Sequence, residues 1–233
     1  MGPNNAGKTS ILEAIYLVST SKSFKASDLD KLANYESKGY KTSVKFVEKD
    51  INSVIIYEKT LNKPKKLLYN DKNVSVSEAM RRLPVQILNF GNLNIFNQRS
   101  DIRRSFLDWG VFHVEPAYSN LLKSFSTILL TRNKVLKRRD LSQLDVWTEK
   151  FVDISLKISL MRELYFDQLN SQFIDLINNT TGLGEYLYDD ISSARLIYSK
   201  GWDKDLSEEL NASKDKDLAI GFTSKGPHRA DFD

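Results

Sequence analysis

A glycine-rich stretch that runs directly into a helical pattern constrains this sequence more than any other feature. Residues 2–9 read Gly-Pro-Asn-Asn-Ala-Gly-Lys-Thr and match the pattern G-x-x-x-x-G-K-[ST] at every position. Residues 8–19 then carry apolar side chains at helical spacing, beginning with Ile11, Leu12 and Ile15. Such a loop points consecutive backbone N–H groups into one concavity at a helix N-terminus. The stretch predicts an α/β fold with a nucleotide site at the start of its first helix.

The residue types in this loop fit a nucleotide bound together with Mg²⁺. Gly2 and Gly7 permit a tight turn and a close approach of the backbone to phosphate. Lys8 is expected to neutralise charge on the β- and γ-phosphates, and the Thr9 hydroxyl to ligate Mg²⁺. An ordinary Gly/Asn-rich turn before a helix is the alternative. The predicted nucleotide-binding residues are Gly2, Pro3, Asn4, Asn5, Ala6, Gly7, Lys8 and Thr9, and the predicted metal ligand is Thr9.

Loops of this type follow a buried strand, and here only Met1 precedes Gly2. We therefore expect the given sequence to begin inside a longer α/β lobe. Met1 is then an alternative start, a misassigned start or an artificial boundary.

Composition excludes several classes of protein. The chain is 41% hydrophobic and 27% charged, which suits a packed core and not a disordered or collagen-like chain. No apolar run approaches the ~20 residues that span a bilayer, and no basic leader precedes an apolar stretch. The absence of cysteine excludes disulfides, thiolate catalysis and cysteine zinc sites. The sequence predicts a cytoplasmic protein without membrane contact.

The first part of the chain indicates a small antiparallel sheet after the first helix. Residues 41–76 alternate apolar and polar positions, as at Val44 and Phe46. Turn residues interrupt the pattern at 49–50, 62–64 and 70–71, which predicts a meander of three or four short strands. Residues 77–83 favour a short helix closed by Pro84, and residues 85–88 favour a buried strand.

From residue 100 onward the pattern is helical. We expect helices over 101–111 and 117–139, the second with Pro116 at its first position. Apolar residues from Phe151 to Leu176 recur at spacings of three and four, which predicts a long helix packed in an αα-hairpin. Gly182 and Gly184 are expected to end it. Residues 194–198 and 218–223 favour strands. The predicted domains are a partial ATPase lobe over 1–100, a helical lobe over 101–190, and strands returning toward the first lobe over 191–233.

Charge is unevenly distributed along a chain of net charge +4. Residues 118–139 hold six basic residues and no acidic one, whereas residues 203–217 hold six acidic residues and three lysines. A basic helix can follow nucleic-acid phosphates without reading sequence, although a solvated helix face gives the same pattern. The DNA-binding candidates are Lys123, Arg132, Lys134, Lys137, Arg138 and Arg139, with Lys63, Lys65 and Lys66 on a hairpin.

Segments across nearly the whole chain resemble the RecF family of bacterial DNA replication and repair proteins. The similar segments, in the family's order, are the loop with Leu12-Glu13-Ala14-Ile15-Tyr16, Thr20-Ser21-Lys22-Ser23-Phe24-Lys25, Arg103-Arg104-Ser105-Phe106-Leu107-Asp108-Trp109-Gly110, Arg132-Asn133, and Gly226-Pro227-His228-Arg229-Ala230-Asp231. The chain departs from the family's pattern at Asn5, at Phe90-Gly91 and at residues 98–100.

The resemblance implies an ABC- or SMC-type P-loop ATPase lobe, here incomplete, with an antiparallel β meander and a helical second lobe. It implies ATP and Mg²⁺ as ligands, and a homodimer that encloses two ATP molecules. That dimer would clamp single-stranded DNA and single–double-strand junctions, and would release DNA on hydrolysis. RecR and RecO, which help to load RecA, are the implied partners in gap repair, replication restart and SOS induction.

The family's Ser-x-Gly-Gln signature and its acid-ending apolar strand do not occur in the given sequence. Leu88-Asn89 ends in an amide, and Asp189-Asp190 follows too short an apolar run. We therefore expect a piece lacking both ends that binds nucleotide weakly and hydrolyses little, with no catalytic residue assigned. The alternatives are a non-catalytic DNA- or partner-binding module and, less in keeping with residues 103–109, an ATPase fused to a nuclease.

Four further residues leave two interpretations open. Gln86 is either a sensor of Mg²⁺ and γ-phosphate or a solvent-exposed glutamine. Arg103 and Arg104 either contact nucleotide, DNA or Asp108, or form a structural salt bridge. His228 either senses the nucleotide or is a buried, hydrogen-bonded histidine.

Overall fold

The computed structural model describes residues 3, 6–48, 50–87, 98–179 and 194–233. The chain divides into two compact units, Met1–Asn89 and Phe90–Asp233, here called unit 1 and unit 2. The domain boundaries predicted near residues 100 and 190 stay predictions. No helix in the described ranges combines the length and apolar character that crossing a membrane requires.

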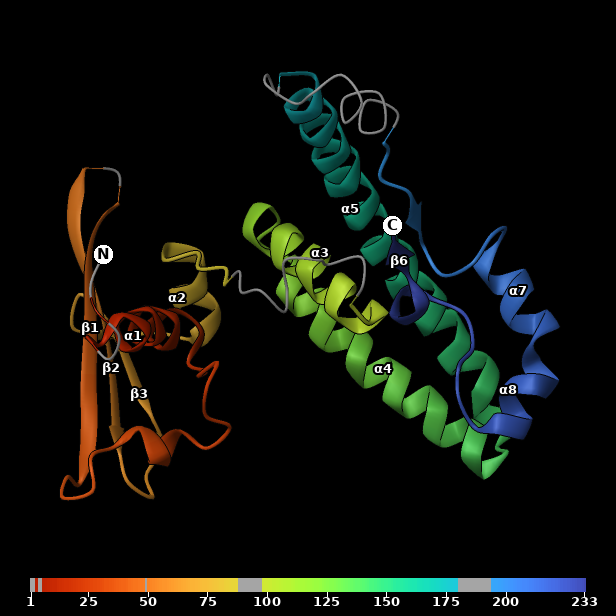
Figure 1. The fold of residues 1–233 in the computed structure, drawn as a ribbon. Helices are drawn as coiled ribbons and strands as arrows, with labels where there is room; N and C mark the ends of the chain where they lie inside the picture. The colour runs from red at the N-terminus through yellow and green to blue at the C-terminus, as the bar shows by residue number, and fades with distance from the viewer. Residues whose placement is uncertain (1–2, 4–5, 49, 88–97, 180–193) are drawn as a thin grey trace. The chain divides into compact units, whose positions relative to one another are not determined.

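Unit 1 is a four-stranded antiparallel sheet with helices on one face (Figure 1). The strands follow one another in the order β1-β2-β3-β4, so the predicted meander is confirmed. Its elements are α1 (Lys8–Thr20), η1 (Leu29–Leu32), β1 (Gly39–Glu48), β2 (Ile51–Thr60), β3 (Lys66–Tyr69), β4 (Lys72–Asn73) and α2 (Val76–Arg82).

The turns of the meander lie where the sequence breaks its alternation. Asp50, Asn62, Asn70 and Asp71 all have positive φ, between 45° and 65°. Asparagine and aspartate tolerate this left-handed conformation better than other residues with a Cβ atom. In β2, side chains that face the helices are buried and their neighbours are more exposed, as the period of two requires.

The core of unit 1 lies between α1, α2 and the sheet. Leu17 and Val18 of α1 pack with Ile55, Tyr57 and Ala79. Each aliphatic side chain removed from water in this way contributes ~1.5–3 kcal/mol. Only the second half of α1 reaches this core.

The buried strand predicted over residues 85–88 is wrong for the described residues 85–87, which form neither strand nor helix. Leu88 lies outside the described residues. An apolar run becomes a strand only when another strand satisfies its backbone, and no described strand pairs with this one.

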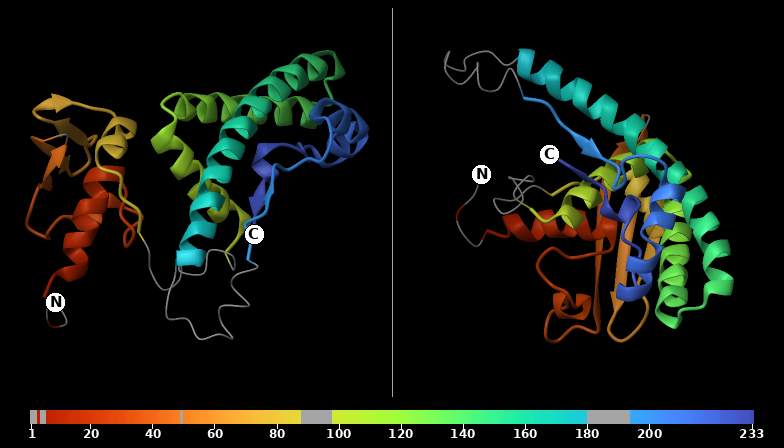
Figure 2. Two further views of the ribbon diagram at one scale, coloured as in Figure 1. Left: turned by 90° about the horizontal axis from the view of Figure 1, so that it is seen from above. Right: turned by 90° about the vertical axis from the view of Figure 1, so that its right-hand side faces the viewer.

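Unit 2 is built on an αα-hairpin, as the sequence predicts (Figures 1 and 2). Helices α4 and α5 pack along each other, α3 contacts both, and α7 and α8 contact α5 and α4 respectively. Helix α4 begins two residues after Pro116. The elements are α3 (Ser100–Val114), α4 (Tyr118–Arg138), α5 (Leu141–Asn179), β5 (Tyr198–Ser199), α7 (Leu206–Ala212), α8 (Lys214–Ile220), η3 (Pro227–Arg229) and β6 (Asp231–Phe232).

The buried face of α5 departs from the predicted stripe after its first turns. Phe151, Ile154 and Ile158 are buried as predicted, but Arg162 and Phe166 are then buried in place of Met161 and Tyr165. A straight α-helix repeats every 3.6 residues, so a stripe written with a period of 3.5 drifts around the helix. The apolar side chain of Leu176 ends up exposed.

Two strand predictions near the end of the chain are corrected. Residues 218–223 are not a strand, because Leu218 to Ile220 belong to α8 and Gly221 ends that helix in the left-handed conformation. Of residues 194–198, only Tyr198 is in a strand, and it pairs with Phe232. These short apolar runs carry no period long enough to separate helix from strand. The helix end predicted at Gly182 and Gly184 lies outside the described residues.

Candidate phosphate-binding loop and basic surface

The candidate phosphate site is the N-terminus of α1. Gly7 is the N-cap, with φ 77° and ψ 7°, a left-handed conformation that glycine adopts at little cost. The Ile11 amide donates to the Gly7 carbonyl at 3.0 Å. Among the described residues, no side chain caps this helix end. Because first-turn amides have no acceptor within their helix, they suit an anion.

Side chains of the loop leave room for a phosphate group. Gly7, Lys8 and Thr9 are all exposed, and a Cβ atom built on Gly7 would meet no atom within 4 Å. The Lys8 ammonium donates to the Pro3 carbonyl at 2.6 Å, and an ammonium can donate up to three hydrogen bonds. Gly2, Asn4 and Asn5 lie outside the described residues. The described part of the loop therefore fits a polyphosphate.

The opposite end of α1 is fixed by polar contacts. The Ser19 hydroxyl donates to the Leu83 carbonyl at 2.6 Å, and the Thr20 hydroxyl donates to the Tyr16 carbonyl at 2.8 Å. The Ser23 hydroxyl donates to the buried Glu13 carboxylate and accepts from the Ala26 amide at 2.8 Å. These bonds explain why small polar residues follow the helix. They fix the C-terminal end of α1, whereas its first turn is exposed.

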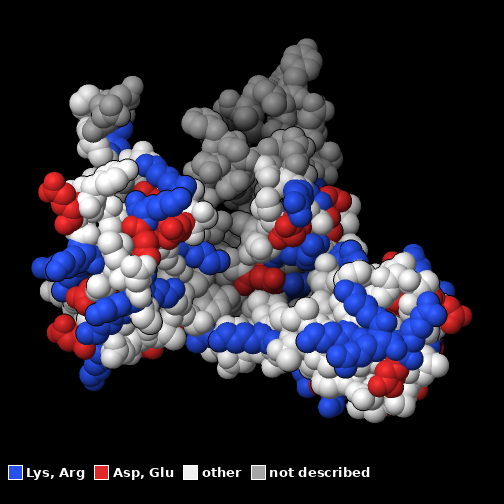
Figure 3. Space-filling model, turned by 90° about the horizontal axis from the view of Figure 1, so that it is seen from below, with Lys and Arg blue, Asp and Glu red and all other residues white. Residues whose placement is uncertain are grey.

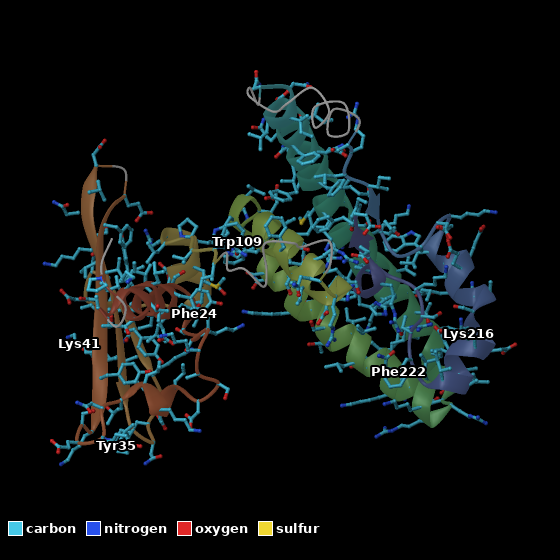
Figure 4. The ribbon with its side chains drawn as sticks, viewed as in Figure 1. Phe24, Tyr35, Lys41, Trp109, Lys216 and Phe222 are labelled. Carbon is cyan, nitrogen blue, oxygen red and sulfur yellow. The ribbon has the colours of Figure 1, made fainter. Side chains whose placement is uncertain are left out.

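The basic surface lies on α4. Lys123, Lys134, Lys137 and Arg138 are exposed along the helix, and Arg139 caps its end. Figure 3 shows that lysine and arginine gather over the side of unit 2 on which α4 lies in Figure 1. The Lys137 ammonium lies 4.3 Å from the centre of the Phe222 ring, which stands at the end of α4 in Figure 4.

The prediction that Arg132 belongs to this surface is wrong. Its side chain is 1% exposed and forms an ion pair with Asp217 of α8, with 3.2 Å between Nη1 and Oδ2. Nη1 also donates to the Thr223 hydroxyl at 2.7 Å, and Nε donates to the Thr148 hydroxyl at 3.1 Å. Burial lowers the pKa of Arg132, and Asp217 opposes that shift. Arg132 is thus a buried structural cation.

The neighbouring Asn133 fixes the same turn. Its side-chain oxygen accepts from the Thr223 amide at 2.9 Å and from the Thr223 hydroxyl at 2.7 Å. Residues 132–133 therefore tie α4 to the segment that leads into residues 226–231.

The arginine pair of α3 and residues 230–231 meet in unit 2. Arg103 Nη2 lies 2.5 Å from Asp231 Oδ2, and Arg103 Nε lies 2.6 Å from Oδ1. Arg104 donates to the Ala230 carbonyl at 2.7 Å. Arg103 holds the pKa of Asp231 below its ordinary value. Of the two interpretations, the structural salt bridge describes Arg103, with Asp231 and not Asp108 as its partner.

Asp108 is paired instead with Arg162, a residue that the sequence analysis missed. Arg162 Nε lies 2.8 Å from Asp108 Oδ1, and Nη1 donates to the Pro227 carbonyl at 2.7 Å. The Tyr118 hydroxyl also contacts Asp108, at 2.5 Å. Arg162 is 3% exposed. An arginine inside the apolar stripe of α5 was the available signal, since such a residue is rarely buried without a carboxylate.

His228 is a half-buried, hydrogen-bonded histidine, so it is less buried than the second interpretation expected. Its Nε2 atom lies 2.9 Å from the Thr223 carbonyl, and Nδ1 is buried without a hydrogen-bond partner among the residues that the structure describes. Burial lowers its pKa to about 4, and the nearby arginines contribute. The next residue, Arg229, is exposed, as is Gln86 in unit 1.

No family model matches the chain. It is 32% identical over 237 residues to the DNA replication and repair protein RecF of Pseudoalteromonas translucida, covering 99% of the chain and 63% of that protein. It is 30% identical over 240 residues to RecF of Hahella chejuensis, covering 99% of the chain and 63% of that protein. The chain thus spans about 63% of the length of these relatives.

Two solved structures have the same fold. One is described as the recombination mediator protein RecF with ATPrS in the RecFOR pathway, and it matches at TM-score 0.79 and 22% identity, with 99% of this chain and 65% of that chain covered. The other, described as RecF with ATP, matches at TM-score 0.78 and 22% identity, with 98% and 64% covered. The predicted fold class, an incomplete α/β P-loop lobe with a β meander and a helical second lobe, is confirmed.

Proposed function

Because the chain is related to the RecF proteins along its whole length, we propose that it is an ATP-binding, DNA-binding protein of DNA replication and repair. The observation that carries the proposal is the G-x-x-x-x-G-K-T loop placed at the open, uncapped start of α1. The RecF structures described with ATP and ATPrS support the same ligand.

The proposed nucleotide site comprises residues 2–9. The first-turn amides and Lys8 would bind the β- and γ-phosphates, and the Thr9 hydroxyl would hold Mg²⁺, which screens the phosphate charge. Lys8 would share its ammonium between the Pro3 carbonyl and phosphate.

A Lys8→Ala variant tests this site. We expect it to lose at least tenfold in affinity for a fluorescent ATP analogue with Mg²⁺, because one charge-assisted contact to phosphate is worth more than 1.4 kcal/mol. Lys45→Ala, which removes an exposed lysine of β1, is the matched control and should bind like the unaltered chain. If Lys8→Ala bound the ATP analogue as tightly as the unaltered chain, residues 2–9 would not be the nucleotide site.

The proposed DNA contact is the α4 surface, with single-stranded DNA and single–double-strand junctions as the preferred forms. For a protein of the relatives' full length, we propose an ATP-dependent homodimer that clamps DNA in gap repair, replication restart and SOS induction, with RecR and RecO as partners. Lys63, Lys65 and Lys66 are secondary candidates on the hairpin of unit 1.

Salt dependence tests the DNA contact. Replacing Lys134, Lys137 and Arg138 with alanine should lower the slope of log affinity against log salt by roughly 2 for a single strand, since each phosphate contact contributes ~0.7. Alanine at Lys150, Lys157 and Lys204, which lie off α4, removes the same charge and should leave the slope unchanged. Equal slopes in both triple variants would place DNA elsewhere.

The second candidate function is a module that binds DNA or a partner without using nucleotide. The basic side chains of α4 favour it, because they belong to unit 2 whereas the phosphate loop belongs to unit 1. DNA binding that is indifferent to MgATP in the unaltered chain would support this module. Tighter DNA retention with MgATP, lost in Lys8→Ala, would support the clamp.

A further inference from the structure

Unit 2 contains a groove of about 740 Å³ between the C-terminal half of α5 and residues 196–203. Its lining combines aromatic side chains, Phe166, Tyr198 and Trp202, with carboxylates from both sides. Residues 194–200 run beside this half of α5 in both views of Figure 2. The groove belongs to unit 2, whereas the phosphate loop belongs to unit 1, and the groove lining includes none of the α4 lysines.

The charge of the groove is opposite to that of the α4 surface. Glu163, Asp167 and Asp203 line it with one cation, Lys200, whose ammonium lies 5.3 Å from the centre of the Trp202 ring. Asp167 and Asp203 are exposed, and neither has an ion-pair partner in the part of the chain that the structure describes. A net negative groove repels nucleic acid and attracts cationic side chains.

The edge of β5 adds backbone groups to this groove. Ile197 and Asp233 exchange both backbone hydrogen bonds, at 2.8 and 3.0 Å. In an antiparallel pair the next residue, Tyr198, then points its N–H and C=O away from β6. No hydrogen bond to either Tyr198 group is present in the described ranges. Two residues earlier on this edge, the Leu196 amide donates to the Asn170 side chain of α5 at 3.3 Å, so the open edge faces the groove.

We propose that this groove receives an extended, basic segment of a partner protein. The segment would pair with the open edge of β5 at Tyr198 and place arginine or lysine side chains against Asp167 and Asp203. Its alternate side chains would contact the parts of Trp202 and Phe166 that reach the groove, each side chain being 4% exposed. Strand addition of this kind draws affinity from backbone hydrogen bonds and specificity from alternate side chains, which is what the edge and the lining provide.

The probe for this surface is a fluorescein-labelled peptide of sequence Arg-Val-Arg-Val-Arg-Val, with Glu-Val-Glu-Val-Glu-Val as its acidic counterpart. Fluorescence polarisation should show binding of the basic peptide alone. The double variant Asp167→Asn, Asp203→Asn should bind it roughly tenfold more weakly, as loss of two partly exposed charge pairs predicts. The matched control is Asp145→Asn, Asp153→Asn, which makes the same charge change on α5 outside the groove lining and should retain affinity.

Backbone N-methylation separates strand pairing from charge attraction alone. Only alternate peptide amides face a neighbouring strand, so methylating one set should abolish binding and methylating the other should not. Equal binding by both methylated peptides, or by both aspartate double variants, would overturn the proposal. A concentration-dependent dimer that the Asp167/Asp203 variant abolishes would also overturn it, because a second copy of the chain would then be the occupant. Lys8→Ala should bind the basic peptide normally, whatever the fate of the nucleotide site.

Discussion

His228 is a neutral side chain held in an apolar setting. Its ring centre lies 6.1 Å from that of Phe151 and 6.2 Å from that of Phe125. A proton added at Nδ1 would place a charge in this setting beside Arg104, Arg132 and Arg229, so the folded state resists protonation.

The stability of the chain should therefore fall as acid is added. The pKa of His228 is lowered to about 4 from an ordinary 6.5, so between these values the unfolded chain binds the proton and the folded chain does not. The contribution of neutral His228 to the free energy of unfolding is complete above pH 6.5. It is lost as the pH falls from 6.5 to about 4. At pH 5 we expect a loss of about 2 kcal/mol relative to pH 7.5 in urea unfolding.

A His228→Phe variant removes this titrating group. The pH dependence between 7.5 and 5 should then shrink. Parallel pH profiles for His228→Phe and the unaltered chain would show that another group titrates with folding.

Buried arginines mark the limit of what residue types alone predict. The sequence shows that Arg132 stands in a basic run, which favours a surface position. It does not show Asp217, which lies 85 positions away and takes Arg132 into the interior. The roles of glycine, lysine and threonine in the phosphate loop can be predicted, because these residues lie close together in the sequence at a fixed spacing. An ion pair between distant elements depends on packing, which the local pattern does not encode.

Helices α3 and α5 cross closely at a glycine. A Cβ atom on Gly110 would collide with the ring and hydroxyl of Tyr165. Alanine favours a helix over glycine by ~1 kcal/mol, but overpacking costs ~1–3 kcal/mol. We expect Gly110→Ala to destabilise the chain by about 1 kcal/mol in urea unfolding.

The effects of Gly110→Ala and Tyr165→Ala on the free energy of unfolding should not add. In the Tyr165→Ala background, Gly110→Ala should cost less, because removing the ring removes the collision. A stabilised Gly110→Ala variant would mean that Tyr165 moves aside without cost and that the contact does not set the helix spacing.

Helices and strands could be predicted where the hydrophobic periodicity continues over many residues or where residues typical of turns interrupt it. The helix at residue 8, the meander and the hairpin meet this condition. Residues 85–87 and 218–223 do not, because short apolar runs take the structure that their tertiary neighbours allow. The drift of the buried face along α5 has a different cause. Its register is set by the 3.6-residue helix, so Arg162 and Phe166 are buried where a strict seam would place Met161 and Tyr165.

At the scale of the whole molecule, the proposed nucleotide and DNA contacts belong to different units. The helix that follows the phosphate loop packs through its second half on the core of unit 1 around Ile55 and Tyr57. The basic helix α4 packs on α5 in unit 2, where Val135, Leu136 and Leu144 form a separate core. Ligand binding stabilises the cooperative unit that carries the site.

Hydrogen exchange should therefore distinguish the two units. With MgATP at 100 times its dissociation constant, amides of β2 should gain about 2.7 kcal/mol of protection, an exchange rate lower by roughly a hundredfold, while amides of α5 keep their rate. Lys8→Ala should remove the effect in β2. Equal slowing in β2 and α5 would contradict this prediction, because it would mean that the units open together and that nucleotide in unit 1 acts directly on the stability of the α4 surface.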